Sequence, residues 1–312
     1  MWRRMLAVAA LVAAPALAQQ VAPGPTGVIA PEEVVDELAI TEADLRMTVP
    51  VSVAGSTPWP FVIDTGSERT VIAAELARRL ALAPGPVRRV TTMAGTAPAS
   101  TALVPELRVG TLAIKGIEAP VFLRANLGAV GMLGIDALQG HKVEIDFDRE
   151  TMTLLPSRRR RPPRPQPDEI VVVAKSLYGQ LIVTDAHWRG RRIAVVLDTG
   201  SSLTVGNPAL LALGRRPPPL LGQVTMIAVT GAAIPANSYR LDRVEIGGVT
   251  FEGVPVVIAD VAPFHRFGLT DRPALLLGMD ALRLFRAVDI DFANRAIVLR
   301  LPRAARMGAT GR

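Results

Sequence analysis

Residues 62–67 of the chain are Val-Ile-Asp-Thr-Gly-Ser, and residues 196–201 repeat the pattern as Val-Leu-Asp-Thr-Gly-Ser. Both copies reach a Thr-Val pair two residues later. An apolar run that ends in an acid, a hydroxyl and a glycine is typical of a buried strand that opens into a tight turn. A single Asp-Thr-Gly is ordinary turn sequence. Two copies, one in each half of the chain, predict that the fold brings the carboxylates of Asp64 and Asp198 together.

Other segments recur around these motifs in the same order. An apolar-apolar-glycine segment follows each copy, and glycine-tipped hairpins are expected around Gly95 and Gly231. The matching pairs of segments are 91–97 with 226–233, 108–112 with 245–249, 132–138 with 276–282, and 144–147 with 289–292. This recurrence indicates a duplicated domain. The second copy is longer, and we expect its extra residues in the loop 263–272.

Composition agrees with two modest globular domains. The chain has 312 residues, of which 49% are hydrophobic and only 4% aromatic, so the cores must consist mainly of Val, Leu, Ile and Ala. The net charge of +7 is concentrated in the first residues and in the run 158–164, and no stacking aromatics accompany it. We therefore expect no nucleic-acid partner.

The first residues resemble an export signal. Arg3 and Arg4 precede an apolar run, 5–18, which ends in the small-x-small pattern Ala-Leu-Ala. This pattern predicts a signal peptide over 1–18 and export to the periplasm or the medium. The apolar run is too short to cross a bilayer as a helix, so no stable membrane insertion is expected. The chain has no cysteine, which excludes a lipoprotein anchor and disulfides.

The remaining segments divide the chain into two lobes. We expect a poorly ordered lead-in over 19–40, lobe one over 41–156, lobe two over 169–303 and a tail over 304–312. Short alternating strands dominate both lobes, with a helix expected over 72–82 and another beginning at Asn207-Pro208. The Arg/Pro-rich segment 157–168 is typical of an extended linker, although it also suits a docking strip for an anionic surface or a maturation site.

The paired D-T-G-S motifs and the later apolar-apolar-glycine segments resemble those of the aspartic peptidases. Specifically, the chain resembles two retropepsin-like domains fused in one polypeptide, as in bacterial secreted or periplasmic aspartyl proteases. The resemblance covers about residues 41–303. It implies an all-β fold of two closed β-barrel lobes with short helices, related by a pseudo-two-fold axis. It also implies that the glycine segments pass through the loop around each acid, and that the hairpins at Gly95 and Gly231 are flaps over a cleft.

The same resemblance implies an activity and a site. Asp64 and Asp198 would share one proton and activate a water that attacks a peptide bond. Because such a pair titrates as a unit, neither acid is assigned as the base. Thr65 and Thr199 would bond across the lobes, Gly66 and Gly200 would let a backbone amide approach the carboxylates, and Ser67 and Ser201 would hold their outer oxygens. Asp136 and Asp280 occupy equivalent places and are candidates to brace the two loops.

Two alternatives stay open at this point. In one the fold serves as a peptide-binding module without turnover, and in the other each lobe pairs with a lobe of another chain to form dyads between chains. We expect a monomer that acts on a peptide or protein substrate, with apolar residues beside the cut bond. Neither a metal nor a cofactor is expected, because His141, His187 and His265 are scattered. The motifs also differ, since Glu68-Arg69 follows the first and Ser202-Leu203 the second, so the cleft walls are not equivalent.

Overall fold

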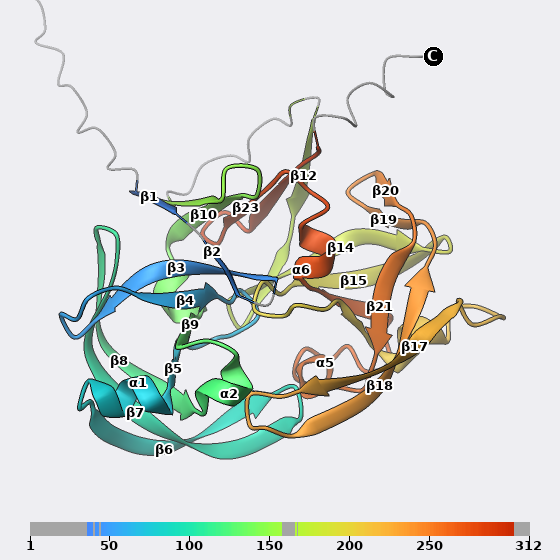
Figure 1. Cartoon of the computed structure of the whole chain (residues 1–312). Coiled ribbons are helices and arrows are strands. Elements are labelled where there is room, and N and C mark those ends of the chain that lie inside the picture. The colour runs from blue at the N-terminus through green and yellow to red at the C-terminus, as the bar shows by residue number, and fades with distance from the viewer. Residues whose placement is uncertain (1–35, 40, 44, 158–165, 167, 303–312) are drawn as a thin grey trace, which may run out of the picture. The chain divides into compact units, whose positions relative to one another are not determined.

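Strands dominate the computed structural model (Figure 1), which describes residues 36–39, 41–43, 45–157, 166 and 168–302. The expected signal peptide, nearly all of the lead-in, most of the linker and the tail lie outside these residues, so export and cleavage after Ala18 stay predictions. The strands of both lobes are given first, and the helices follow. The strands are β1 (Asp36–Ala39), β2 (Thr41–Ala43), β3 (Arg46–Val53), β4 (Trp59–Ile63), β5 (Val71–Ala73), β6 (Ala83–Thr92), β7 (Gly95–Val109), β8 (Leu112–Phe122), β9 (Gly131–Leu133), β10 (His141–Asp146), β11 (Thr151–Pro156), β12 (Glu169–Val173), β13 (Lys175–Leu177), β14 (Gln180–Trp188), β15 (Arg191–Leu197), β16 (Val205–Gly206), β17 (Leu220–Ile227), β18 (Ala233–Leu241), β19 (Val244–Ile246), β20 (Val249–Phe251), β21 (Val254–Ile258), β22 (Ala274–Leu277), β23 (Ala287–Asp291) and β24 (Ala296–Arg300). The helices are α1 (Ala74–Arg79), α2 (Arg124–Leu127), α3 (Ile135–Leu138), α4 (Pro208–Leu211), α5 (Ala262–Arg266) and α6 (Met279–Leu282).

The two halves of the chain build the same sheet. In lobe one the neighbouring strands run β3-β4-β9-β5-β8-β7-β6, and in lobe two they run β14-β15-β22-β16-β21-β18-β17. In both lobes the strand that ends at the D-T-G-S motif pairs in parallel with the strand of the apolar-apolar-glycine segment: β4 with β9, and β15 with β22. In lobe one the sheet also closes on itself through β3 with β7, and in lobe two β14 continues the sheet to β19 and β20. The predicted all-β, two-lobed fold is confirmed.

The cores contain mostly aliphatic side chains, as the low aromatic content requires. Val, Ile, Leu and Ala supply most of the buried residues of the described chain, with a few large rings such as Trp188, Phe61 and Phe264 among them. Trp188 keeps its indole nitrogen bonded, because Nε1 donates to the Asp242 carbonyl at 2.9 Å. Burial of this aliphatic surface, at about 25 cal/mol per Å², stabilises the strands that carry the two motifs.

A third sheet joins the lobes. It has the order β1-β11-β10-β23-β24-β12, so three strands from the first half of the chain lie beside three from the second half, as the colours of Figure 1 show. The lobes meet where β10 pairs with β23. Asp289 on β23 is 1% exposed and accepts both Arg300 Nη1 at 2.7 Å and Arg300 Nη2 at 2.6 Å, while Lys142 on β10 lies 3.1 Å away. A buried, multiply bonded ion cluster of this kind fixes how the two halves meet.

The structure bears on four local expectations. The helix expected over 72–82 is shorter, because Val71–Ala73 form the buried strand β5 between β9 and β8 and α1 begins only at Ala74. The lead-in expectation fails for Asp36–Ala39, which pair with β11. The helix start at Asn207 is confirmed, since its Oδ1 accepts the Leu210 amide at 2.9 Å. The loop expected to hold the extra residues of lobe two carries α5.

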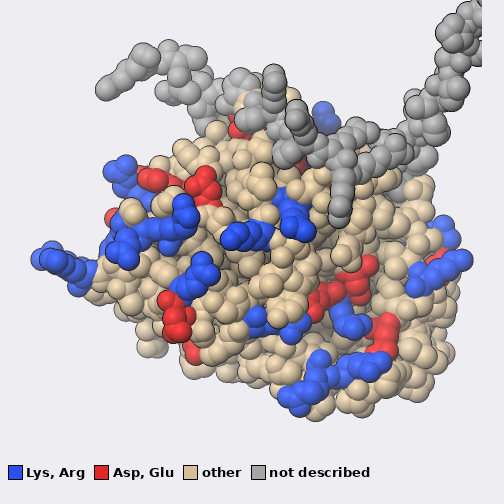
Figure 2. All heavy atoms as spheres, turned by 180° about the vertical axis from the view of Figure 1, so that it is seen from behind, with Lys and Arg blue, Asp and Glu red and all other residues tan. Residues whose placement is uncertain are grey.

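The charged side chains do not form one basic surface on the face shown in Figure 2. Lys and Arg there are interspersed with Asp and Glu. The basic run 158–164 lies outside the described residues. Within the part of the chain that the structure describes, no helix has the length and apolar character needed to cross a membrane.

Candidate active site

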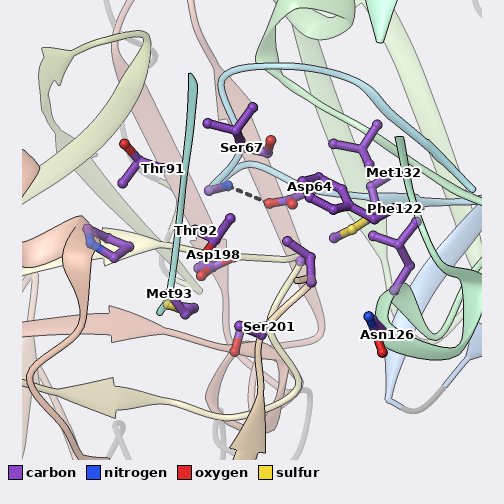
Figure 3. Close-up of a pocket in the computed structure, with 18 of the residues that line it drawn as sticks. Asp64, Ser67, Thr91, Thr92, Met93, Phe122, Asn126, Met132, Asp198 and Ser201 are labelled. Carbon is purple, nitrogen blue, oxygen red and sulfur yellow. Dashed lines mark hydrogen bonds between the residues drawn. The ribbon is translucent and has the colours of Figure 1, made fainter. Parts of the chain in front are cut away.

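The two D-T-G-S motifs meet at the bottom of a cleft. β4 ends at Ile63 and β15 at Leu197, so each following Asp stands at the end of a buried strand. The Asp64 amide donates to Leu133 O at 2.9 Å, and the Asp198 amide donates to Leu277 O at 3.0 Å, which holds each acid to the glycine segment of its own lobe. Figure 3 shows the side chains of Asp64 and Asp198 in the same pocket, and each residue is only 8% exposed.

The threonines of the motifs bond across the lobes in a reciprocal arrangement. Thr65 Oγ1 donates to Leu197 O at 3.1 Å and accepts the Thr199 amide at 3.2 Å. Thr199 Oγ1 donates to Ile63 O at 2.8 Å and accepts the Thr65 amide at 3.1 Å. All four bonds are buried and join backbone that precedes or follows the two acids. They therefore fix the position of each acid relative to the other.

Each glycine of the motifs lies against the acid of the opposite lobe. A Cβ added to Gly66 would stand 2.6 Å from Asp198 Oδ1, and a Cβ added to Gly200 would stand 2.3 Å from Asp64 Cγ. No side chain fits in either place. The glycines are needed because the two turns pass so close that a methyl group on one would collide with the carboxyl of the other.

The surroundings of the acids raise both pKa values. Burial has the largest effect on each, and the charge of Asp198 raises the pKa of Asp64 further, to about 8. The pKa of Asp198 is raised to about 6. Backbone amides of Gly66 and Ser67, and of Gly200 and Ser201, act in the opposite direction by donating to the carboxylates. A pair with these properties takes up protons together, and one proton is retained at pH values where an ordinary aspartate has none.

A second acid braces each motif. Asp136 accepts the amide and the hydroxyl of Thr70 at 2.8 and 2.7 Å, and Asp280 accepts those of Thr204 at 3.1 and 2.6 Å. The same threonine hydroxyls accept the amides of Gly134 and Gly278, both at 3.1 Å. Burial raises the pKa of Asp136 and Asp280, although the hydrogen bonds from Thr70 and Thr204 lower it.

The glycine segments lie directly beneath the motif loops. A Cβ on Gly134 would stand 2.3 Å from the Arg69 carbonyl carbon, and one on Gly278 would stand 2.4 Å from Leu203 O. The Ser67 and Ser201 carbonyls accept the amides of Ile135 and Met279, both at 2.9 Å, which closes each loop.

Contrary to the expectation from the sequence, the side chains of the motif serines do not hold the carboxylates. The Ser67 hydroxyl donates to Arg69 O at 2.7 Å, and the Ser201 hydroxyl donates to Leu203 O at 2.8 Å. A hydroxyl has one proton to donate, and here it stabilises the turn that follows the motif. The two serines contribute to the carboxylates through their backbone amides instead.

Two hairpins border the cleft, which has a volume of about 580 Å³. The hairpin β6–β7 turns just before Gly95, and the hairpin β17–β18 turns at Gly231. Each tip reaches a helix of the other lobe. Met93 O accepts the Ala262 amide of α5 at 3.2 Å, and a Cβ on Gly231 would stand 2.9 Å from Asn126 Nδ2 of α2. Figure 3 shows Thr91, Thr92 and Met93 of the first hairpin among the residues around the two acids.

Two further polar residues line the cleft and were not singled out from the sequence. Arg46 is 8% exposed and Gln180 is 3% exposed. Each stands 18 residues before the Asp of its own motif, so superposing the two repeats would have revealed the pair. Gln180 Nε2 donates to Gly66 O at 2.6 Å, which adds one more bond between the lobes.

No group of three or more His, Cys, Asp and Glu residues suited to a metal occurs in the described ranges.

Comparison with known families agrees with this geometry. A model described as aspartyl protease matches residues 49–137 and 184–281, which together make up more than half of the chain. The chain belongs to the aspartyl protease family. The two matched regions each include one D-T-G-S motif and one glycine segment, so the aspartyl protease domain occurs twice. A search among curated proteins finds no match. Membership of the family supports a peptidase-type function in general.

Proposed function

We propose that this protein is an aspartic endopeptidase whose catalytic dyad is Asp64 and Asp198 of one chain. The observation that carries the proposal is the close approach of the two motifs, in which each motif glycine lies against the carboxyl of the other lobe. Two buried carboxyls in such a place share protons, as in the dyads of the family to which the chain belongs.

The reaction follows from the state with one proton on the pair. A water between the carboxyls loses a proton to the ionised acid and attacks the carbonyl carbon of the scissile bond. The protonated acid donates a hydrogen bond to the carbonyl oxygen, where negative charge develops. The tetrahedral intermediate collapses when the amine leaves with a proton from the dyad. The bonds from the amides of residues 66, 67, 200 and 201 keep the carboxylates oriented throughout.

The cleft supports a peptide substrate with apolar residues near the cut. Aliphatic and aromatic side chains from both lobes line much of it, among them Val71, Phe122, Met132, Met226, Ile227 and Phe267. The two hairpins border the cleft from opposite lobes, an arrangement suited to an extended peptide held between them. Because each tip contacts a helix of the other lobe, we expect these contacts to open before a substrate enters.

A cleavage assay on a library of apolar peptides tests the proposal. We expect wild-type protein to cleave, and Asp64→Asn and Asp198→Asn each to lower kcat/KM by about 10²- to 10⁴-fold or more. Both losses should be similar, and chelators should have no effect. A peptide mimic with a hydroxyl in place of the attacking water should inhibit. If folded Asn variants cleaved as fast as wild type, the dyad would be wrong. If wild type bound peptides without cleaving any, the protein would be a binding module.

A further inference from the structure

Arg46 occupies a special place in lobe one. The antiparallel ladder of β3 and β4 ends where Thr48 pairs with Val62, and continuing its register by two residues would bring Arg46 opposite Asp64. In lobe two, Ile182 pairs with Val196, which in the same way places Gln180 opposite Asp198. The repeat therefore puts a cation beside one acid and a neutral amide beside the other.

The Arg46 side chain is buried beside the dyad, and its Nε has no hydrogen-bond partner among the described residues. Its Nε lies away from solvent and donates to no atom in the described part of the chain, where none of the ion pairs includes Arg46 either. The residue is 8% exposed, yet it lines the cleft. Gly128, at the end of α2, leaves room for it, because a Cβ there would stand 2.4 Å from Arg46 Nη2. Gly128 has φ +65°, which also favours glycine.

A buried guanidinium without a hydrogen-bonded anion is costly in a free protein, and the cost is removed when a ligand supplies the anion. The planar fork of arginine fits a carboxylate by two parallel hydrogen bonds. The charge of Arg46 also lowers the pKa of Asp64 and of Asp198. It thus offsets the negative charge of the dyad, which would otherwise repel an acidic substrate from this part of the cleft.

We propose that Arg46 determines specificity by binding a carboxylate of the peptide substrate in a subsite beside the dyad. This inference rests on the proposed function of the same cleft. The carboxylate comes either from an acidic side chain near the cut bond or from a free C-terminus. Gln180, which already donates to Gly66 O, gives the other side of the cleft no cation at the equivalent place. The preference therefore applies to one side of the cut bond and not to both.

Matched peptides test the inference. One series of cleaved octapeptides carries Glu at each position around the cut in turn, and a second series carries Gln. A third compares peptides that end shortly after the cut with a free carboxylate or with an amide. At a pH of about 7, where a Glu side chain is ionised and the dyad holds one proton, we expect wild type to prefer the carboxylate by about 10- to 100-fold in kcat/KM at one position. The series in which the preference occurs identifies the source of the carboxylate.

Variants show whether Arg46 causes the preference. Arg46→Gln gives lobe one the residue of lobe two and should bring the ratio close to one, whereas Arg46→Lys should keep part of it. Arg192→Gln removes an arginine from an exposed place on β15 outside the cleft and should keep the full ratio. If wild type showed no preference at any position, or if Arg46→Gln kept it, the inference would be overturned. A further outcome would also overturn it. If Arg46→Gln shifted the pH profile equally for the Glu and Gln peptides and left their kcat/KM ratio as in wild type, Arg46 would act on the dyad alone.

A binding measurement separates this inference from the proposed function. Two labelled octapeptide pools that differ only in Glu or Gln at one fixed position are titrated against folded Asp198→Asn protein, with and without the Arg46→Gln change. We expect the Glu pool to bind more tightly by about 10-fold or more, and only when Arg46 is present. Binding of this kind without any cleavage by wild type would refute the peptidase and retain the carboxylate site. Equal binding of both pools would refute the site, whether or not wild type cleaves.

Discussion

Lobe one and lobe two have the same strand order and the same bonds around their acids, but they differ in the side chains that face the cleft. The cross-lobe bonds of Thr65 and Thr199 mirror each other, and so do the braces from Asp136 and Asp280. Beside the acids, by contrast, Arg46 in lobe one takes the place that Gln180 takes in lobe two. After the motifs, lobe one has Glu68-Arg69 where lobe two has Ser202-Leu203.

This comparison separates two kinds of constraint. Positions that set the geometry of the acids carry the same residue types in both lobes, because the two motif loops meet each other in the same way from either side. Positions that face the substrate differ because a peptide has a direction and presents different groups to the two walls. The predictions below test first the equivalent positions and then the unequal ones.

Among the substitutions, those of the motif threonines should give the largest loss of stability. Thr65→Val and Thr199→Val each remove two buried hydrogen bonds and leave a backbone amide and a carbonyl without a partner. We expect each to lower the free energy of unfolding by about 2–4 kcal/mol. Thr250→Val, at an exposed place on β20, should change it by less than about 0.5 kcal/mol. Chemical denaturation measures all three. A large cost for only one of the two motif threonines would contradict their equivalence.

The dyad should make the protein less stable as pH rises. Because the folded pKa values of Asp64 and Asp198 lie above the ordinary value of 3.8, the folded state binds more protons than the unfolded state from about pH 4 up to about pH 8. The stabilisation from these protons is full below pH 4 and is lost as pH rises through the folded pKa values. Each proton contributes at most about 1.4 kcal/mol per pH unit.

Removing one acid should flatten this dependence. Asp64→Asn and Asp198→Asn should both lose less stability than wild type between about pH 4 and pH 8, and both should be at least as stable as wild type near neutral pH. Asp148→Asn, in the exposed turn between β10 and β11, serves as the matched control and should keep the wild-type slope. Denaturation at several pH values measures the slopes. If both dyad variants kept the wild-type slope, the raised pKa values would be refuted.

The ion pair between Glu68 and Arg266 should give the smallest effect. Arg266 Nε donates to Glu68 Oε1 at 2.7 Å across the lobes, and the guanidinium also lies 4.3 Å from the centre of the Tyr178 ring. Both partners are about one-third exposed, so Glu68→Gln should lower the free energy of unfolding by less than about 1 kcal/mol, and less still at high salt. Glu68→Ser, which copies lobe two, should behave alike. A larger loss would mean that this pair holds the lobes together.

Much of the fold and of the site follows from the repeat in the sequence. The two motifs, the glycine segments and the hairpins at Gly95 and Gly231 are local patterns, and their order in each half is visible without coordinates. The pairing of β10 with β23 is different, because it joins residues about 145 positions apart and depends on how the halves meet. The serines differ for another reason: a hydroxyl in such a turn has two possible acceptors, the carboxylate and the local backbone, and the sequence does not choose between them, whereas in the structure both serines donate to the backbone two residues on. Arg46 was missed because an arginine at the start of a strand has no local signal, although its place matches that of Gln180.

The most direct test of the account mixes two inactive proteins. Asp64→Asn and Asp198→Asn are unfolded together, refolded together and assayed for peptide cleavage against each protein refolded alone and against wild type treated in the same way. If both acids of a working site come from one chain, the mixture stays as inactive as its components while wild type recovers its activity. If the site forms between chains, a mixed pair holds one intact Asp64 opposite one intact Asp198, and cleavage returns. Recovered activity in the mixture would contradict the single-chain dyad.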